Sequence, residues 1–224
     1  KDEDGEEIKV TQNPDGTYTF TQPDGKVTIT VTFRCDGGEL CPSDHLTDVE
    51  EDGWYHDAVD YVVEHGIMEG MSPTTFAPRR ELTRAEVVQV LYNLEGRPDV
   101  TGENIFTDTA KHWAVDPITW AATTGVVDGY GDDTFRPNNP VSRQEFAQML
   151  YNYAKFKGYD LTAQGDLTQF PDKRAVSSWA TTAMSWANGN GLINGSDGKL
   201  LPGGTTTRAQ AASILRNFHQ NFVL

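Results

Sequence analysis

Three arginines lie at equivalent positions in three similar segments of this 224-residue chain. The segments read LTRAEVVQVL, VSRQEFAQML and TTRAQAASIL, and their arginines are Arg84, Arg143 and Arg208. In the first segment, Thr83 and Glu86 have the spacing of a capping box, which predicts that a helix begins there. The arginine then lies in the first helical turn, where the positive end of the helix dipole disfavours a cation. Its recurrence therefore indicates a role other than helix formation.

Two explanations of these arginines remain open, an anionic ligand and an ion pair between copies. A guanidinium is a planar fork that grips a carboxylate at two points, and a helix N-terminus offers outward-pointing N–H groups to an anion. A surface ion pair contributes only about 0–1 kcal/mol, which favours the ligand, so we expect the fold to tolerate replacement of the arginines. The partners in the alternative ion pair are Asp48, Asp108 and Asp172.

The arginines belong to three copies of one longer unit. In each copy a tryptophan is followed at constant distances by two glycines, and a proline precedes the arginine at a constant distance. The tryptophans and glycines are Trp54, Gly66 and Gly70, then Trp113, Gly125 and Gly129, then Trp179, Gly191 and Gly195. A register kept over three copies is typical of a repeat protein.

Each copy predicts a helix, a loop and a second helix. Aromatic pairs such as Trp54 and Tyr61 lie two turns apart on the first helix, and apolar stripes such as VVQVLYNL form the second. The first glycine of each copy is the expected C-cap in the left-handed region. Two helices cannot bury both stripes alone, so the copies must pack on one another. The expected helices span about 54–65, 83–95, 113–124, 142–156, 179–190 and 207–221.

This pattern resembles the S-layer homology domain of bacterial surface proteins. The resemblance rests on the FTD start, the tryptophan, the passage GVVDGYGDDTFRPNNPVSRQE and the TRAE-type motif. In copy three this last motif ends in Gln210. The resemblance covers Leu46 to about Phe222. It implies a mainly α fold, in which three helix-loop-helix repeats form a pseudo-threefold helical assembly. It also implies non-covalent binding to the secondary polysaccharide of Gram-positive cell walls, which often carries ketal-linked pyruvate.

The resemblance further implies where this anionic polysaccharide binds, in grooves between the repeats. The arginine would hold the pyruvate carboxylate, the aspartate would orient the arginine or take a sugar hydroxyl, and the tryptophan edge would lie against the sugar ring. The missing Cβ of the second glycine would let a ligand approach the backbone. Taken alone, the tryptophans read as core residues, the aspartates as turn or cap residues and the glycines as loop residues. The expected ligand residues are Arg84, Arg143, Arg208, Asp48, Asp108, Asp172, Trp54, Trp113, Trp179, Gly70, Gly129 and Gly195.

Composition and motifs exclude other classes of function. The net charge of −15 argues against nucleic acid, which is bound by basic surfaces. No run of about 18 apolar residues is present, so we expect no membrane insertion. Motifs of the G-x-S-x-G, H-E-x-x-H, P-loop and dinucleotide types are absent, as is a D-x-D-x-D-G calcium loop. We therefore expect no enzyme, cofactor or metal. A self-assembling module of a surface layer, without a glycan site, is the alternative function.

The residues before the repeats differ in composition. Pro-Asp-Gly turns and alternating β-formers predict a hairpin of 17–21 with 26–33. Cys35 and Cys41 predict a disulfide, with two reduced thiols or half of a metal site as alternatives. The acidic start KDEDGEEIKV indicates a cut from a longer exported protein of the cell wall, with its signal peptide upstream. The expected parts are 1–41 (hairpin and linker), then repeats at 42–100, 101–162 and 163–224.

Overall fold

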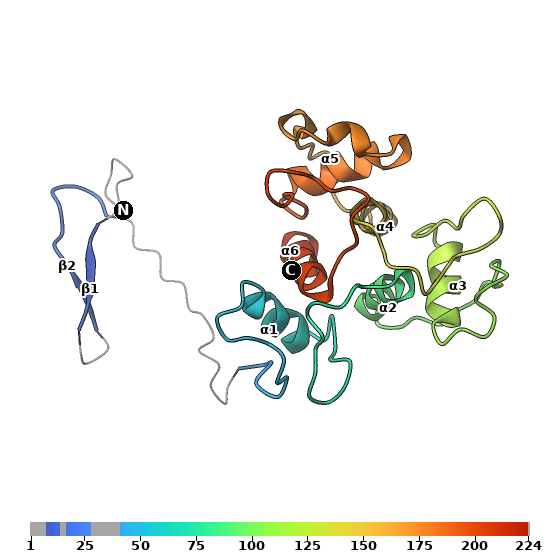
Figure 1. The fold of residues 1–224 in the computed structure, drawn as a ribbon, viewed down its shortest axis with the longest axis horizontal. Coiled ribbons are helices and arrows are strands. Elements are labelled where there is room, and N and C mark those ends of the chain that lie inside the picture. The colour runs from blue at the N-terminus through green and yellow to red at the C-terminus, as the bar shows by residue number, and fades with distance from the viewer. Residues whose placement is uncertain (1–7, 14–16, 28–40, 224) are drawn as a thin grey trace. The chain divides into compact units, whose positions relative to one another are not determined.

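The computed structural model describes residues 8–13, 17–27 and 41–223. The chain forms two compact units, Lys1–Arg34 and Cys35–Leu224. The first holds an antiparallel hairpin of β1 (Val10–Gln12) and β2 (Tyr18–Phe20), drawn in blue in Figure 1.

The predicted hairpin has the wrong partner strand. β2 lies within the predicted 17–21, but it pairs with β1 on its N-terminal side, with Val10 opposite Phe20. Two Pro-Asp-Gly sequences can each join strands, and the pair flanks the first, where the Asn13 N–H donates to the Thr17 carbonyl at 2.8 Å. Lys26 and Val27 are not in a strand, and 28–33 lies outside the described residues, as does Cys35 of the predicted disulfide.

The second unit confirms the three helix-loop-helix copies. Every helix begins and ends within two residues of its predicted limits. Capping boxes start all three second helices, at Thr83, Ser142 and Thr207. The glycines after the first helices have φ of 62°, 72° and 68°, which confirms them in the left-handed region. The helices are α1 (His56–Glu64), α2 (Arg84–Leu94), α3 (Val115–Thr123), α4 (Arg143–Lys157), α5 (Thr181–Gly189) and α6 (Arg208–Phe222).

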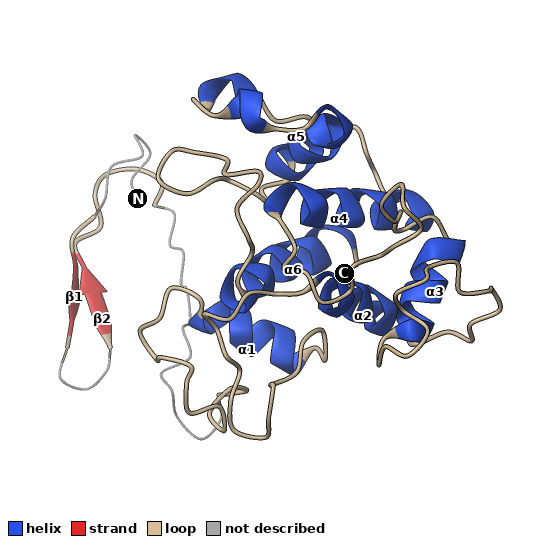
Figure 2. Ribbon diagram, turned by 45° about the vertical axis from the view of Figure 1, so that its right-hand side comes forward, coloured by secondary structure: helices blue, strands red, loops and turns tan. Residues whose placement is uncertain are grey.

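The helices form a closed pseudo-threefold assembly, as expected. Helices α2, α4 and α6 lie together at the centre, with α1, α3 and α5 around them (Figure 1). Each outer helix packs against the second helix of the preceding copy, so that α3 contacts α2, α5 contacts α4 and α1 contacts α6. Figure 2 shows that residues 41–223 consist of helices and the long loops that join them. None of the described helices is both long and apolar enough to cross a lipid bilayer.

A ring of backbone hydrogen bonds joins the three copies at the centre. The Leu82 N–H donates to the Thr206 carbonyl at 2.8 Å, Thr206 to Val141 at 3.1 Å, and Val141 back to Leu82 at 2.8 Å. All three residues are fully buried, and each directly precedes the N-cap of a second helix. The ring therefore fixes where all three central helices begin.

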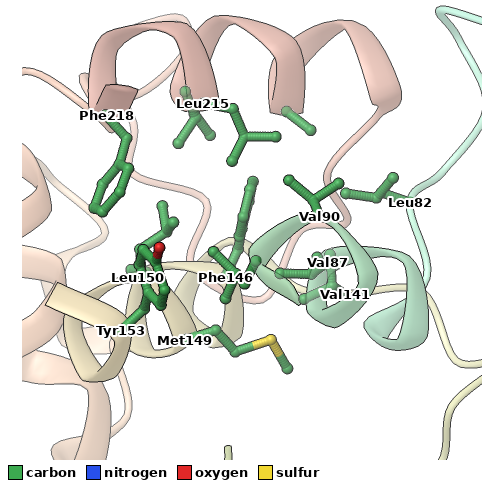
Figure 3. Close-up of a cluster of buried hydrophobic side chains, with 14 of the residues drawn as sticks. Leu82, Val87, Val90, Val141, Phe146, Met149, Leu150, Tyr153, Leu215 and Phe218 are labelled. Atoms are coloured by element: carbon green, nitrogen blue, oxygen red, sulfur yellow. The ribbon is translucent and has the colours of Figure 1, made fainter. Parts of the chain in front are cut away.

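Apolar side chains of the central helices fill the space beside this ring (Figure 3). Phe146 and Leu150 of α4 face Leu215 and Phe218 of α6, and all four are buried. Each such side chain contributes about 1.5–3 kcal/mol on burial. Part of the hydrophobic core is therefore formed between copies, as expected for repeats that must pack on one another.

The ring also generates a stability prediction. The Thr206 hydroxyl is buried and has no hydrogen-bond partner among the described residues, whereas Leu82 and Val141 are apolar at the equivalent positions. Thr206→Val keeps the shape and removes an unsatisfied polar group, so we expect the free energy of unfolding to rise by about 1 kcal/mol. Urea denaturation measures this change.

The neighbouring threonine gives a matched control. The Thr207 side chain accepts the Gln210 N–H as the N-cap of α6, so Thr207→Val should lower the free energy of unfolding by about 1 kcal/mol. A loss of stability of the same size in Thr206→Val would contradict the prediction.

Candidate functional site

Two grooves gather the expected ligand residues, and each groove takes them from all three copies. The Arg84 groove has a volume of about 500 Å³ and is lined by Arg84 of copy one, Gly129 of copy two and Trp179 of copy three. The Arg143 groove has a volume of about 440 Å³ and is lined by Arg143, Gly195 and Trp54, in the same cyclic order. The remaining set, Arg208, Gly70 and Trp113, would complete a third groove by this order, which stays a prediction.

The tryptophans are exposed, so the reading of them as core residues is wrong. Trp54, Trp113 and Trp179 are 68%, 62% and 53% exposed. Each lies just before the first helix of its copy rather than on its buried face. The aromatic residues two turns later, such as Trp120 and Trp186, are buried instead. Exposed indole rings at the rims of grooves are available to stack on a ligand.

Arg84 is a clip between copies one and two. It is 4% exposed; its Nε donates to the Phe135 carbonyl at 2.9 Å and its Nη1 to Glu145 at 2.9 Å. The guanidinium also lies 4.6 Å from the centre of the Phe135 ring. The alternative of an ion pair between copies is therefore correct for Arg84, although the acid is Glu145 and not an aspartate.

Glu145 stays ionised in this buried setting. Burial acts to raise its pKa, but hydrogen bonds from Ser142 and from the Tyr130 hydroxyl, together with the Arg84 charge, outweigh burial and hold the pKa of Glu145 below its usual value. The Tyr130 hydroxyl lies 2.7 Å from the carboxylate. The positive charge in the Arg84 groove is thus balanced by a negative one.

Arg208 makes the corresponding contacts from copy three to copy one. Its Nε donates to the Phe76 carbonyl and its Nη2 to the Glu69 carbonyl, both at 2.6 Å. Burial lowers the pKa of Arg208, and the Glu86 carboxylate opposes that shift. Glu86, which occupies the position of Glu145, itself binds Arg80 at 2.7 Å.

Arg143 differs from both. It is 9% exposed, yet its guanidinium makes no hydrogen bond or ion pair with any described residue, and its Nε is buried without a partner. Burial lowers the pKa of Arg143, and no acid opposes it. The equivalent position offers no carboxylate, because the N3 residue of α6 is Gln210 where that of α4 is Glu145.

The lining of the Arg143 groove leaves this charge unbalanced. Amide side chains of Asn194, Gln210 and Asn217 face the groove together with exposed Trp54, and its lining contains no acidic residue. A buried cation without a carboxylate partner is costly. This groove therefore has the charge and the polar groups to receive an anion that bears hydroxyl groups.

The three aspartates hold loops and do not contact the arginines. Each carboxylate accepts two consecutive backbone N–H groups of its own copy, as Asp108 does from Phe135 at 2.9 Å and Arg136 at 2.7 Å. The second donor of each pair has a left-handed φ, 57° at Arg136, which costs energy in a residue other than glycine. The expectation that the aspartates orient the guanidiniums is wrong, and their reading as turn residues is correct. Asp48 and Asp172 bind Phe76 and Ala77, and Leu200 and Leu201, in the same way.

Close packing accounts for the second glycine of each copy. A Cβ on Gly129 would overlap the Phe106 ring and lie 2.7 Å from the Thr134 carbonyl oxygen. Gly70 and Gly195 are similarly crowded by their own loops. These glycines are needed for the loops whether or not a ligand approaches.

The N-termini of α2, α4 and α6 are not anion sites, so the expectation that their N–H groups point outward to an anion is wrong. The Arg84 and Ala85 N–H groups donate to the carbonyls of Asn139 and Pro137 of the next copy, both at 3.0 Å. The starts of α4 and α6 are occupied in the same way by loops of copies three and one. At these helix starts, the groups that remain to contact an anion are side chains.

The sequence did not reveal that Glu145 and Gln210 line the two grooves. Gln210 was visible as a departure from the motif, but the sequence does not show that it lines the same groove as Arg143. The two residues belong to consecutive copies and come together only in the folded chain.

Comparison with known proteins agrees with this architecture. The sequence model of the S-layer homology domain matches residues 45–88, 105–147 and 169–212. The Surface-layer 125 kDa protein of Lysinibacillus sphaericus is 30% identical over 176 residues, which cover 75% of this chain and 14% of that protein. The S-layer protein sap of Bacillus anthracis is 28% identical, with 78% of this chain and 21% of that protein covered.

Similar proteins also include an enzyme. Amylopullulanase of Thermoanaerobacterium thermosulfurigenes is 28% identical over 172 residues, which cover 74% of this chain and 9% of that protein. This chain thus spans only about a tenth to a fifth of the length of these relatives. Three consecutive matches, each on one helix-loop-helix copy, show that the chain belongs to the S-layer homology domain family.

Proposed function

We propose that this chain anchors a surface protein to the bacterial cell wall by binding an anionic wall polysaccharide, with the Arg143 groove as the principal site. The observation that carries the proposal is the buried, uncompensated guanidinium of Arg143. Family membership supports a place at the cell surface. The expected ligand is the pyruvylated secondary wall polysaccharide, whose ketal carboxylate supplies the missing negative charge.

The groove offers a partner to each part of such a ligand. A carboxylate bound to Arg143 would form charge-assisted hydrogen bonds, which are about twice as strong as neutral ones. The amides of Asn194 and Asn217 can exchange hydrogen bonds with sugar hydroxyls, and the exposed ring of Trp54 can cover an apolar sugar face. The net charge of −15 makes this local positive charge selective, because the rest of the surface repels anions on average.

The Arg84 groove suits a different part of the polymer. Its arginine is already paired with Glu145, so an anion would have to compete with a carboxylate. Hydroxyl groups of an uncharged sugar can instead approach Glu145, Gln148 and Asn152, with Trp179 at the rim. We therefore expect this groove to bind neutral sugars more readily than the ketal carboxylate.

The relatives support a module that is separate from catalysis. Proteins named as S-layer proteins and proteins named as polysaccharide-degrading enzymes share the same short segment with this chain. A segment common to both classes does not explain the enzymatic names. The chain's own role is accordingly binding, with self-association in a surface layer as a second possibility.

The binding prediction compares two arginine variants. Isothermal titration with purified wall polysaccharide should show about ten- to a hundredfold weaker binding by Arg143→Met, because a charge-assisted contact is lost. Arg84→Met should weaken binding much less in its folded fraction. Polymer stripped of ketal pyruvate should bind the native protein and Arg143→Met equally. Equal binding of intact polymer by the native protein and Arg143→Met would disprove the assigned site, and no binding by either would favour self-assembly.

The same variants should differ in stability in the opposite order. Arg84→Met removes the cationic partner of Glu145 and leaves the buried Phe135 carbonyl without its donor, so we expect the free energy of unfolding to fall by about 3 kcal/mol. Arg143→Met loses no hydrogen bond to a described residue and keeps the apolar stem, so the change should stay below about 1 kcal/mol. Urea denaturation measures both, and equal losses would mean that Arg143 is also a clip.

A further inference from the structure

A buried cluster outside the grooves contains three groups that bind metals. The Cys41 sulfur, the His56 Nε2 and the Asp60 carboxylate lie within 4.8 Å of one another. The sulfur is 3.3 Å from Nε2 and 3.1 Å from Asp60 Oδ1, and Nε2 is 3.2 Å from Oδ2. The three residues are 6%, 4% and 7% exposed. His56 and Asp60 lie one turn apart on α1, and Cys41 lies in the turn that precedes copy one.

The hydrogen bonds of His56 aim a lone pair at the cluster. Its Nδ1 lies 3.0 Å from the Glu50 carbonyl oxygen, which can only accept, so Nδ1 carries a proton. In the neutral ring Nε2 is then an acceptor, and it faces a carboxylate and a sulfur. A backbone carbonyl that fixes the tautomer in this way is the usual second partner of a metal-bound histidine.

Only one of the two carboxylate oxygens of Asp60 accepts hydrogen bonds. Its Oδ1 accepts the Ser43 N–H at 3.1 Å and the Cys41 thiol. Its Oδ2 is buried and has no hydrogen bond in the described structure. A buried carboxylate oxygen needs a proton donor or a cation. Among the described residues, the nearest candidate donor is the His56 Nε2, at 3.2 Å, which would have to carry a second proton on the ring.

The repeat fold does not require these residues. At the positions of His56 and Asp60, copy two has Val115 and Thr119, and copy three has Thr181 and Ser185. In copy two, the Thr119 hydroxyl is satisfied within the helix by the Val115 carbonyl at 2.8 Å. The same architecture thus forms twice in this chain without an acid and an imidazole beneath its first helix.

We propose that Cys41, His56 and Asp60 bind a zinc ion, which fastens the turn before copy one to α1. Zinc accepts thiolate, imidazole and carboxylate ligands in tetrahedral geometry, with Zn–S about 2.3 Å and Zn–N or Zn–O about 2.0–2.1 Å. Those lengths place ligand atoms about 3.3–3.6 Å apart. The sulfur–Nε2 distance already fits, and the sulfur and Nε2 each lie near a different oxygen of Asp60, so coordination by one oxygen requires a small rotation of the carboxylate. Binding releases the thiol proton to solvent, and a fourth position stays open for water.

The test uses the whole chain in reduced, metal-free form and zinc itself as the probe. We expect one equivalent of zinc to bind, the melting temperature to rise with zinc and to fall back with a chelator. Cobalt in place of zinc should give a thiolate-to-metal charge-transfer band, which reports the Cys41 sulfur directly.

Two variants separate a metal site from a polar packing cluster. The double change His56→Val with Asp60→Thr copies the pair found in copy two, so it should fold but show no response to zinc. Cys41→Ser should lose the cobalt band. His45→Gln, which changes an exposed histidine nearby, should behave as the native protein.

Three results would overturn the proposal. One is that the melting temperature of the reduced native protein changes with neither zinc nor chelator. The cluster would then be an imidazolium–carboxylate pair. Another is equal zinc binding by the double variant, which would mean binding elsewhere. The third is a Cys35–Cys41 disulfide that persists in the folded native protein and survives mild reductant, since it would remove the thiolate.

Discussion

The assembly depends on the ring of three backbone hydrogen bonds through Leu82, Val141 and Thr206. Each bond joins a different pair of copies, so no copy can shift without breaking two of them. The ring holds the start of every central helix beside the loop of the next copy, whose carbonyls then take the first N–H groups of that helix. Helix capping, which is a local matter in most proteins, is here part of the contact between repeats.

This use of the helix starts decides what the arginines do. The N–H groups at these helix starts are already bonded to carbonyls of the next copy, and the guanidiniums of Arg84 and Arg208 reach across to that copy as well. The third residue of the neighbouring helix differs there. Glu145 neutralises Arg84, whereas Gln210 offers no charge to Arg143, whose guanidinium has no partner among the described residues. A repeat that looks symmetric in sequence thus contains one groove that is electrostatically unlike another, with acidic residues in the lining of the Arg84 groove and none in that of the Arg143 groove.

Local features of the fold could be predicted from the sequence, and contacts between copies could not. The helix limits, the capping box at Thr83 and the left-handed Gly66 follow from interactions within a few residues, and all were confirmed. The exposure of Trp54 was missed, because the helical spacing does not say that α1 begins two residues later. The partner of Arg84 was missed, because a second copy supplies it. For the hairpin, one strand was predicted correctly and its partner was not. Two identical turn sequences could each join strands, and the sequence does not show which of them does.

The contact between α1 and α6 joins the first copy to the last, and this has a mechanical consequence. In an open stack of repeats, a pulling force peels the end unit, which is held on one side only. Here a force applied through the segment before α1 loads a unit that is held on both sides, by α6 and by the central ring. Detaching this unit then requires both the contact with α6 and the bonds of the ring to break. A closed three-unit assembly therefore resists traction as a single body, which suits an attachment that is under continual strain.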